Sequence, residues 1–533
     1  MKLEKGYDFI IIGGGTSGCV LANRLSENPV VSVLLLEAGG MDNNPWIHMP
    51  VGFAKMTTGA LTWGLSTVPQ KNAHDRVIPY AQAKVIGGGS SINAEIYTRG
   101  NPIDYNRWAN EEGCPRWSFE EVLPYFIKSE ANSVFSGHWH GTEGPLGVSS
   151  LHHATPITLS FLQACQELGI PYNPDFNGEV QEGAGTYQVT TRNGRRCSAA
   201  TGYLKPVLNR PNLTLCTKAM ALRIQCEGNR ASGVEVAMGN QKQFVNADSE
   251  VIVASGAINT PKLLMLSGIG PSVHLKKHGI SVVINLPGVG ENLQDHFGVD
   301  IVAELTGPYG LDHYERPLGM LKAGMQYILY KSGPVTSNVV EGGVFWYSDK
   351  SKPVPDLQCH FLAGAGKEAG VPSIPSGTGI TLNSYTLRPT SRGTVRLFSS
   401  DPADNPLVDP NFLDTEYDRN TSANGVKLSV EIFNQPSLSK YIKTIHFPGK
   451  DVRSHADYIN YSRQFGRTSY HPTCTCKMGN DKMSVVDSEL KVHGFDNLRV
   501  CDSSVMPSLI GSNTNAATAM IAEKGSDLIR QNY

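Results

Sequence analysis

Near its beginning the chain reads Asp8-Phe9-Ile10-Ile11-Ile12-Gly13-Gly14-Gly15-Thr16-Ser17-Gly18. The β-branched and aromatic run over residues 8–12 predicts a buried strand. The glycines after it fit the spacing G-x-G-x-x-G, and apolar residues at helical intervals follow them. A strand, a glycine-rich turn and a helix in this order predict the first unit of a Rossmann-like α/β domain.

Each glycine of this turn has a physical reason to be there. Gly13 makes the tight turn, Gly15 lets the backbone approach a pyrophosphate, and Gly18 lets the helix pack closely on the strand. Thr16 and Ser17 open the helix, where free N–H groups and the positive end of the helix dipole favour phosphate. The motif predicts a dinucleotide cofactor and does not by itself separate FAD from NAD.

A second strand and an acidic residue support this interpretation. Residues 31–36 predict another buried strand, which ends at Glu37 and is followed by Ala38. A carboxylate at this point accepts hydrogen bonds from the ribose of a dinucleotide. A glycine-rich turn without a ligand is the alternative, and it explains neither the second strand nor Glu37.

Composition limits the other classes of function. The chain has 533 residues and a net charge of −2, so it is long enough for several domains and lacks the basic excess of a nucleic-acid-binding protein. No stretch reaches the roughly 18 apolar residues of a membrane helix. We expect a cytoplasmic protein with reduced cysteines, and docking on a membrane surface stays open. Cys474-Thr475-Cys476 is the one close cysteine pair in the sequence, and no metal site is expected.

The remaining chain divides by pattern. Residues 213–224, 233–237 and 251–254 predict further strands around a hairpin turn, and a helix follows at 260–267. Between about 300 and 465, short alternating runs at 299–305, 344–347, 357–362, 380–387 and 393–397 predict a largely antiparallel sheet, flanked by helices near 317–331 and 418–434. We therefore expect a mixed α/β (α+β overall) fold. Its FAD-binding domain would comprise 1–300 and 466–533 and would contain some interspersed segments of the substrate-binding domain. The inserted substrate-binding domain itself would comprise 301–465.

Five motifs together resemble the glucose–methanol–choline (GMC) oxidoreductases, which bind FAD. These motifs are Gly13–Gly18 with Glu37, the segment Gly87–Asn93, the segment Gly256–Gly270, the segment Val289–His296, and the closing Tyr470-His471-Pro472 with Asn513-Thr514-Asn515. They occur in the family's order and cover essentially the whole chain. The resemblance implies an enzyme that oxidises an alcohol by hydride transfer to flavin N5.

The same resemblance implies roles for single residues. His471 matches the family's active-site histidine, which acts as the base, and Asn515 matches the second member of its His–His or His–Asn pair. His296 matches a residue in a turn of the cofactor domain and is expected to be structural. Further FAD contacts are expected from Trp63, Gly88, Gly89, Ser91, Asn93, Ala94, Ala221 and Asp502. Some relatives attach FAD covalently through a histidine at the position of Ile92, so this chain is expected to bind FAD non-covalently.

The substrate is suggested by a narrower resemblance within the family. The segments 47–56, 172–178 and 469–479 resemble members that oxidise a sugar, and this resemblance implies a sugar or small alcohol as substrate, with oxidation of L-sorbose to L-sorbosone as the specific expectation. Glu341, Phe345 and Trp346 are candidates for the substrate wall, although an aromatic pair on a strand is more often core. Electrons would pass to a quinone or dye-like acceptor. An oxidase that forms hydrogen peroxide, a hydroxynitrile lyase on the same fold, and a nucleotide-binding protein without catalysis are the alternatives.

Overall fold

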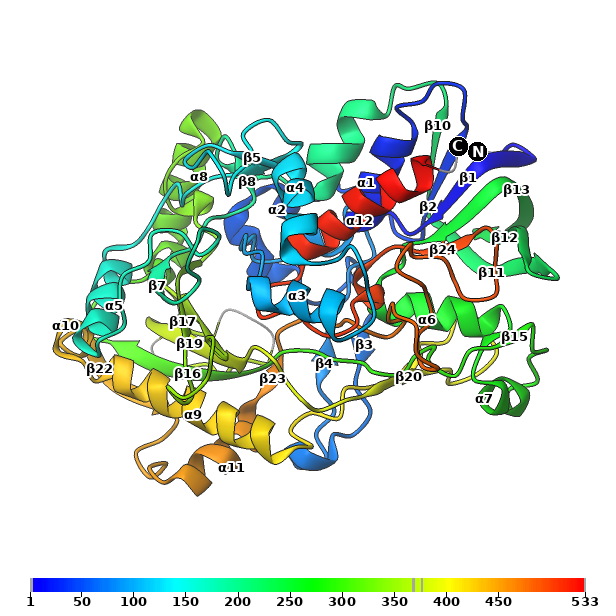
Figure 1. The fold of residues 1–533 in the computed structure, drawn as a ribbon. Helices are drawn as coiled ribbons and strands as arrows, with labels where there is room; N and C mark the ends of the chain where they lie inside the picture. The colour runs from blue at the N-terminus through cyan, green and yellow to red at the C-terminus, as the bar shows by residue number, and fades with distance from the viewer. Residues whose placement is uncertain (1–2, 367–369, 375–376, 532–533) are drawn as a thin grey trace.

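The computed structural model describes residues 3–366, 370–374 and 377–531 (Figure 1). Within these ranges the fold is built on two seven-stranded sheets. The first sheet has the strand order β10-β2-β1-β13-β12-β11, with β24 beside β13. Its strands are β1 (Gly6–Ile12), β2 (Val33–Glu37), β10 (Leu213–Thr217), β11 (Ala219–Glu227), β12 (Arg230–Met238), β13 (Gln241–Val253) and β24 (Leu498–Val500). The strands β10, β2, β1, β13 and β24 pair in parallel, which is the expected Rossmann-like arrangement.

Two details of this sheet differ from the sequence prediction. The single strand expected over 213–224 is two strands, because Lys218 adopts a left-handed backbone (φ 55°) that turns the chain between β10 and β11. Conversely, the short strand expected at 251–254 is the end of one long strand, β13, which begins at Gln241. The first half of β13 pairs antiparallel with β12, and its end pairs parallel with β1 and β24.

The second sheet is antiparallel throughout, in the order β22-β16-β19-β18-β17-β7 with β23 beside β16. Its strands are β7 (Gly183–Thr186), β16 (Phe297–Leu305), β17 (Val340–Trp346), β18 (Leu357–Leu362), β19 (Gly379–Thr386), β22 (Ile442–Phe447) and β23 (Arg467–Thr468). The run at 393–397, expected in this sheet, forms β20 (Thr394–Arg396) and pairs with β21 (Leu407–Asp409) in a separate ribbon. Each large sheet has its own cluster of buried apolar side chains.

Helices cover both sheets and include the two expected near 317–331 and 418–434. The longer ones are α1 (Thr16–Leu25), α3 (Pro102–Asn110), α4 (Phe119–Ser129), α5 (Pro156–Glu167), α6 (Gly256–Leu266), α8 (Pro317–Tyr330), α9 (Glu416–Phe433), α11 (His455–Phe465) and α12 (Asn515–Arg530). The short ones are α2 (Pro45–His48), α7 (Ser272–Lys277) and α10 (Pro436–Ser439), with 3-10 turns that include η1 (Pro50–Lys55) and η3 (Gly88–Ser91). None of the helices in the described ranges is both long and apolar enough to span a bilayer.

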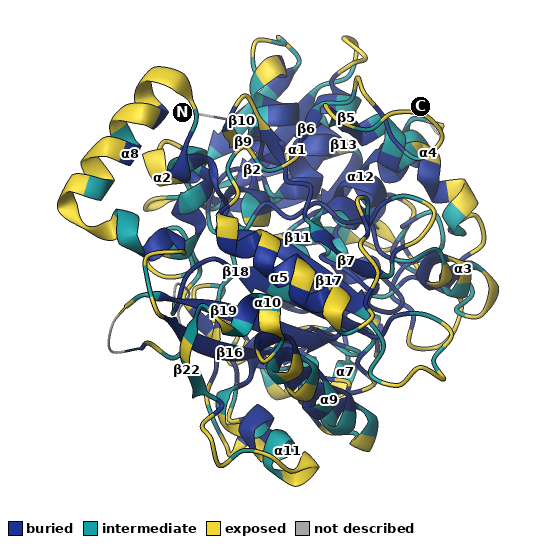
Figure 2. Cartoon of the chain, turned by 90° about the vertical axis from the view of Figure 1, so that its left-hand side faces the viewer, coloured by how far each residue is buried: buried dark blue, intermediate teal, exposed yellow. Residues whose placement is uncertain are grey.

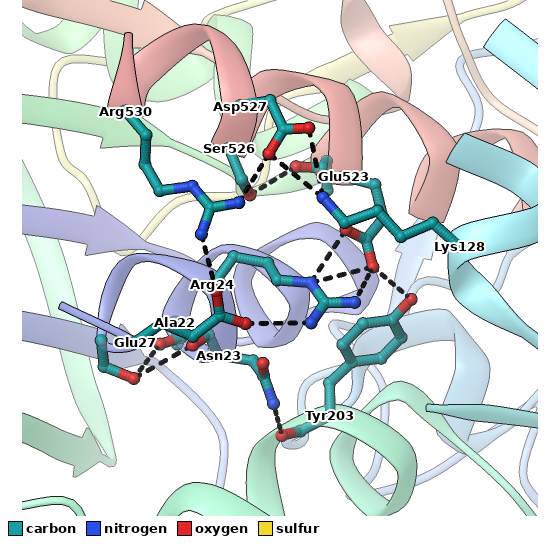
Figure 3. Close-up of polar contacts among 12 residues, drawn as sticks. Ala22, Asn23, Arg24, Glu27, Lys128, Tyr203, Glu523, Ser526, Asp527 and Arg530 are labelled. Atoms are coloured by element: carbon teal, nitrogen blue, oxygen red, sulfur yellow. Dashed lines mark hydrogen bonds and ion pairs between the residues drawn. The ribbon is translucent and has the colours of Figure 1, made fainter. Parts of the chain in front are cut away.

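A buried ionic cluster joins the last helix to the first (Figure 3). The carboxylate of Glu523 on α12 is fully buried and accepts hydrogen bonds from Arg24 on α1, at 2.7 and 2.9 Å. It also accepts a hydrogen bond from the Tyr203 hydroxyl at 2.9 Å and lies 3.3 Å from the Lys128 ammonium. Because a buried charge is costly unless it is paired, this cluster fixes α12 against α1 and brings the two ends of the chain into one structural unit.

Candidate functional site

A cavity of about 320 Å³ is lined by residues of both large sheets. Most of the residues predicted from the sequence line it, namely Gly13, Gly15, Thr16, Ser17, Glu37, Ala38, Trp63, Gly88, Gly89, Asn93, Ala94, Ala221, His471, Asp502 and Asn515. Val340, His360, Leu362 and Asn383, on three strands of the antiparallel sheet, line it as well. The fold therefore brings the two ends of the chain and the inserted sheet to one site.

Two of the predicted cofactor residues, Gly18 and Ser91, do not line the cavity but support the turns that form its wall. A Cβ atom added to Gly18 would lie 1.8 Å from the Gly13 carbonyl oxygen, so this position accepts no side chain. The buried Ser91 hydroxyl donates to the Ile86 carbonyl at 2.7 Å and thereby holds the second glycine turn. These contacts keep the turn after β1 and the turn η3 in their positions beside the cavity.

The geometry at the first glycine turn fits a pyrophosphate. Ser17 is buried in the first turn of α1, and its Oγ has no hydrogen-bond partner within the described part of the chain. Gly15 and Gly88 face each other across this wall, since a Cβ added to Gly15 would be 3.8 Å from the Gly88 Cα. An unused hydroxyl beside the N-terminus of a helix is a ready donor to phosphate oxygens.

Two buried carboxylates border the same cavity. Glu37 accepts hydrogen bonds from the backbone N–H groups of Gly14 (2.8 Å) and Gly39 (2.6 Å), and burial raises its pKa. Asp502 accepts from the Gly256 N–H at 2.8 Å and the Thr260 hydroxyl at 2.6 Å, and burial raises its pKa as well. These hydrogen bonds fix both side chains, so they can accept hydrogen bonds from cofactor hydroxyls in a set orientation.

The three residues suggested for the substrate wall do not line the cavity. Glu341 is fully buried, and its carboxylate accepts hydrogen bonds from Thr155 and Thr158 at the beginning of α5. Phe345 packs edge-on against Phe176, with ring centroids 5.0 Å apart. The Trp346 ring meets the Lys350 ammonium. Successive residues of a strand point to opposite faces, and the sequence did not reveal which face of β17 meets the cavity.

Hydrogen bonds determine which nitrogen of His471 carries its proton. His296 Nε2 lies 2.9 Å from the Leu387 carbonyl oxygen, which can only accept, so His296 is protonated at Nε2. Burial lowers the pKa of His296 to about 4, so its other nitrogen is an acceptor at neutral pH. His471 Nδ1 lies 3.0 Å from that nitrogen and must therefore donate to it. The remaining nitrogen, His471 Nε2, carries no proton, as a general base requires.

Asn513 is the amide beside this base, and the sequence interpretation missed it. Its Nδ2 lies 3.2 Å from His471 Nε2, while its Oδ1 accepts from Gln358 at 3.0 Å and from Thr98 at 3.2 Å. These two donors fix the orientation of the amide. Asn515, the predicted partner of His471, instead accepts from the Thr16 hydroxyl at 2.9 Å and begins α12. Both asparagines belong to the quoted closing motif, and the one whose amide lies beside His471 is Asn513 and not the predicted Asn515.

A second imidazole, that of His360, also lines the cavity and was not foreseen. Its Nε2 lies 3.1 Å from the Tyr385 hydroxyl and 3.1 Å from the Gln358 amide nitrogen. Burial lowers the pKa of His360 to about 3, and the pKa of His471 lies well below its ordinary value because of burial and because of His296 and His360 nearby. All three imidazoles are therefore neutral at neutral pH.

This electrostatic setting predicts an unusual pH profile. An ordinary histidine base with a pKa near 6.5 loses half of its active form at that pH, whereas His471, whose pKa is lowered, stays unprotonated. We expect the rate constant of alcohol-driven flavin reduction, measured anaerobically, to show no histidine-type fall between about pH 8 and about pH 6. The buried Asp295 accepts a hydrogen bond from the His471 backbone N–H, and burial raises its pKa to about 6. Because Asp295 could itself titrate in this range, the same measurement on Asp295→Asn is the control. A rate halved near pH 6.5 in both proteins would contradict the prediction.

Comparison with known proteins places this site in a family. Sequence profiles described as GMC oxidoreductase match residues 7–298 and 389–522. The chain belongs to the GMC oxidoreductase family. It is 43% identical to an alcohol dehydrogenase [acceptor] of Pseudomonas putida, over 98% of this chain and 95% of the relative. It is 40% identical to the mitochondrial choline dehydrogenase of Mus musculus, over 98% of this chain and 89% of the relative.

Two solved structures share the whole fold. A pyridoxine 4-oxidase from Mesorbium loti has a TM-score of 0.90 at 30% identity and covers 99% of this chain and 100% of its own. A formate oxidase of Aspergillus oryzae has a TM-score of 0.94 at 27% identity and covers 100% and 99%. The predicted fold class is confirmed, as are the enzyme class, an FAD-dependent alcohol dehydrogenase, and the cofactor, FAD.

Proposed function

We propose that this chain oxidises an alcohol group of a small substrate, with His471 Nε2 as the base that removes the hydroxyl proton. The observation that carries the proposal is the unprotonated Nε2 of His471 beside the fixed amide of Asn513, both on the cavity wall. FAD, when bound, supplies the acceptor of the hydride at flavin N5. The protein supplies orientation, a base, and a donor to the substrate oxygen.

The roles of the two side chains follow from their chemistry. Asn513 Nδ2 can donate to the substrate oxygen and so stabilise the negative charge that develops as the proton leaves. His471 receives that proton, and His296 holds the imidazole in the required tautomer and orientation. His296 therefore acts as a positioning residue and not merely as part of a turn.

The proposed cofactor contacts follow the cavity wall. The backbone around Gly13, Gly15 and η3 would hold the pyrophosphate, with Glu37 and Asp502 at cofactor hydroxyls and Trp63 farther along the wall. Ile92 lines the cavity and offers no nucleophile, which supports non-covalent FAD. We retain residues 1–300 and 466–533 as the proposed FAD-binding part and 301–465 as the proposed substrate-binding part.

Polar residues near the base support a hydroxylated substrate such as L-sorbose, oxidised to L-sorbosone. Asn383, Arg467 and Ser469 line the cavity, and Asn383 and Arg467 are both held by the buried Asp300. The guanidinium of Arg467 in this wall would also repel a positively charged substrate such as choline. The proposed electron acceptor is a quinone or a dye-like molecule.

An anaerobic spectrum tests the proposal. We expect the flavin bands to bleach on addition of L-sorbose and to recover slowly in air. Rapid recovery with hydrogen peroxide would indicate an oxidase, the activity that the names of the two structural relatives carry. Bleaching by simple primary alcohols or choline but not by L-sorbose would keep the chemistry and replace the substrate. Failure of every alcohol to bleach the flavin, together with release of cyanide from a hydroxynitrile, would overturn the redox function.

A further inference from the structure

The most exposed apolar surface of the described chain lies on one helix, α8, which projects from the side of the molecule (Figure 2). Leu318 is 82% exposed, Ile328 70% and Leu329 69%. Leu321 and Met325 are exposed as well. At 3.6 residues per turn these five side chains form one stripe along the helix. We call this stripe the α8 face.

The other side of α8 packs on the protein. Ala323 and Tyr327 are buried, and the Tyr327 hydroxyl donates to the His48 carbonyl at 3.2 Å. His48 ends α2, and η1, which follows, carries Phe53 to the cavity wall. The α8 face thus points away from the molecule, opposite the anchored side. An ordinary surface helix shows the reverse pattern, with polar residues outward.

The charges around the α8 face are mostly positive. From residue 315 to residue 335 the sequence contains Arg316, Lys322 and Lys331 against one acidic residue, Glu315. All three basic residues are exposed. On the neighbouring segments, Lys55 lies 5.3 Å from the ring of the partly exposed Trp46. An outward apolar stripe bordered by basic side chains, with tryptophan nearby, is the pattern of a helix that lies in a membrane interface.

We propose that the α8 face docks this protein on an anionic lipid bilayer, with α8 parallel to the surface. The apolar stripe would enter the boundary between head groups and acyl chains, and the basic side chains would contact lipid phosphates. The exposed lysines reach outward while their stems cover apolar surface. Such docking would keep the enzyme at a membrane without a spanning helix. The proposal goes beyond the proposed alcohol oxidation and does not depend on the identity of the substrate.

A second copy of the chain fits the α8 face less well. Two such faces packed together about a twofold axis would bring the basic residues of both copies close to one another, which costs free energy. An anionic lipid surface supplies the opposite charge. Charge complementarity therefore favours lipid over self-association.

Vesicle sedimentation of the full-length protein with its FAD tests this proposal. We expect it to bind vesicles of phosphatidylcholine with added phosphatidylglycerol more strongly than vesicles of phosphatidylcholine alone, and less strongly as salt rises. The double variant Leu321→Glu/Ile328→Glu should lower the partition coefficient roughly tenfold or more, because two charges then replace the inserted side chains. Lys322→Glu should lower only the part of binding that depends on phosphatidylglycerol.

Val273→Glu is the matched control. Val273 is 83% exposed on α7, away from α8 (Figure 1). No side chain of α8 lines the cavity, so alcohol-driven flavin reduction should be unchanged in every variant and reports correct folding. Equal vesicle binding by the double variant and by Val273→Glu would overturn the proposal. The proposal would also be overturned if the unsubstituted protein bound no vesicles and instead formed a dimer that the double variant abolished.

Discussion

Replacement of His471 by alanine should slow alcohol-driven flavin reduction by roughly 10²–10⁴-fold, the usual contribution of a general base. His471 Nε2 is the nitrogen left unprotonated by the hydrogen bond to His296, and its neighbour is the fixed amide of Asn513. No residue that we place at the pyrophosphate bonds to the His471 side chain. FAD content should therefore stay at the level of the unsubstituted protein. Stopped-flow reduction under anaerobic conditions measures the rate, and the visible spectrum measures the cofactor.

A pair of asparagine variants serves as the control for this assignment. Asn513→Ala removes the donor beside the base and should lower the reduction rate by roughly 10²-fold, the lower range for loss of such a donor. Asn515→Ala removes the acceptor of the Thr16 hydroxyl and should chiefly weaken FAD binding. If Asn515→Ala slowed the chemical step more than Asn513→Ala, the catalytic partner of His471 would be Asn515, as the sequence predicted, and not Asn513. Undiminished reduction in His471→Ala would exclude His471 as the base.

Local patterns were sufficient to predict most of the fold. The strand–glycine–helix run at 8–18 fixes hydrogen-bond geometry and packing within a few residues, so β1, the turn and α1 could be anticipated. The sequence failed where the outcome depends on distant partners. β13 is one strand because its two halves pair with different neighbours, and nothing in the residues 244–251 signals that change. The left-handed Lys218 likewise interrupts a run whose composition suits one strand.

The site shows the same division. Glycine spacing identified the cofactor end, because each glycine answers a local steric demand. The substrate end is assembled from separate strands, and a side chain reaches it only if its strand has the right register. Thus His360 on β18 lines the cavity, whereas Phe345 on β17 is buried in the core. The position of the proton on His471 depends, through His296, on the backbone carbonyl oxygen of Leu387, and no sequence motif identifies that contact.

The two glycines of the first turn should fail in different ways when they become alanine. A Cβ on Gly18 would lie 1.8 Å from the Gly13 carbonyl oxygen, so Gly18→Ala must move the backbone and should yield little folded protein. A Cβ on Gly15 would have the Gly88 Cα at 3.8 Å as its nearest neighbour, which is ordinary contact, and Gly15 has no positive φ. Gly15→Ala should therefore fold. Its methyl group would occupy the wall at which the backbone approaches the pyrophosphate.

For Gly15→Ala we expect an FAD dissociation constant higher by roughly 5- to 150-fold, the equivalent of the 1–3 kcal/mol that overpacking typically costs. Equilibrium titration of cofactor-free protein by flavin fluorescence measures it, and circular dichroism verifies the fold. Gly449→Ala is the control, since its added Cβ would meet nothing within 4 Å and Gly449 does not line the cavity. If Gly15→Ala bound FAD as tightly as Gly449→Ala, the pyrophosphate would not approach this turn. If Gly18→Ala folded normally, close packing of α1 on β1 would not be required.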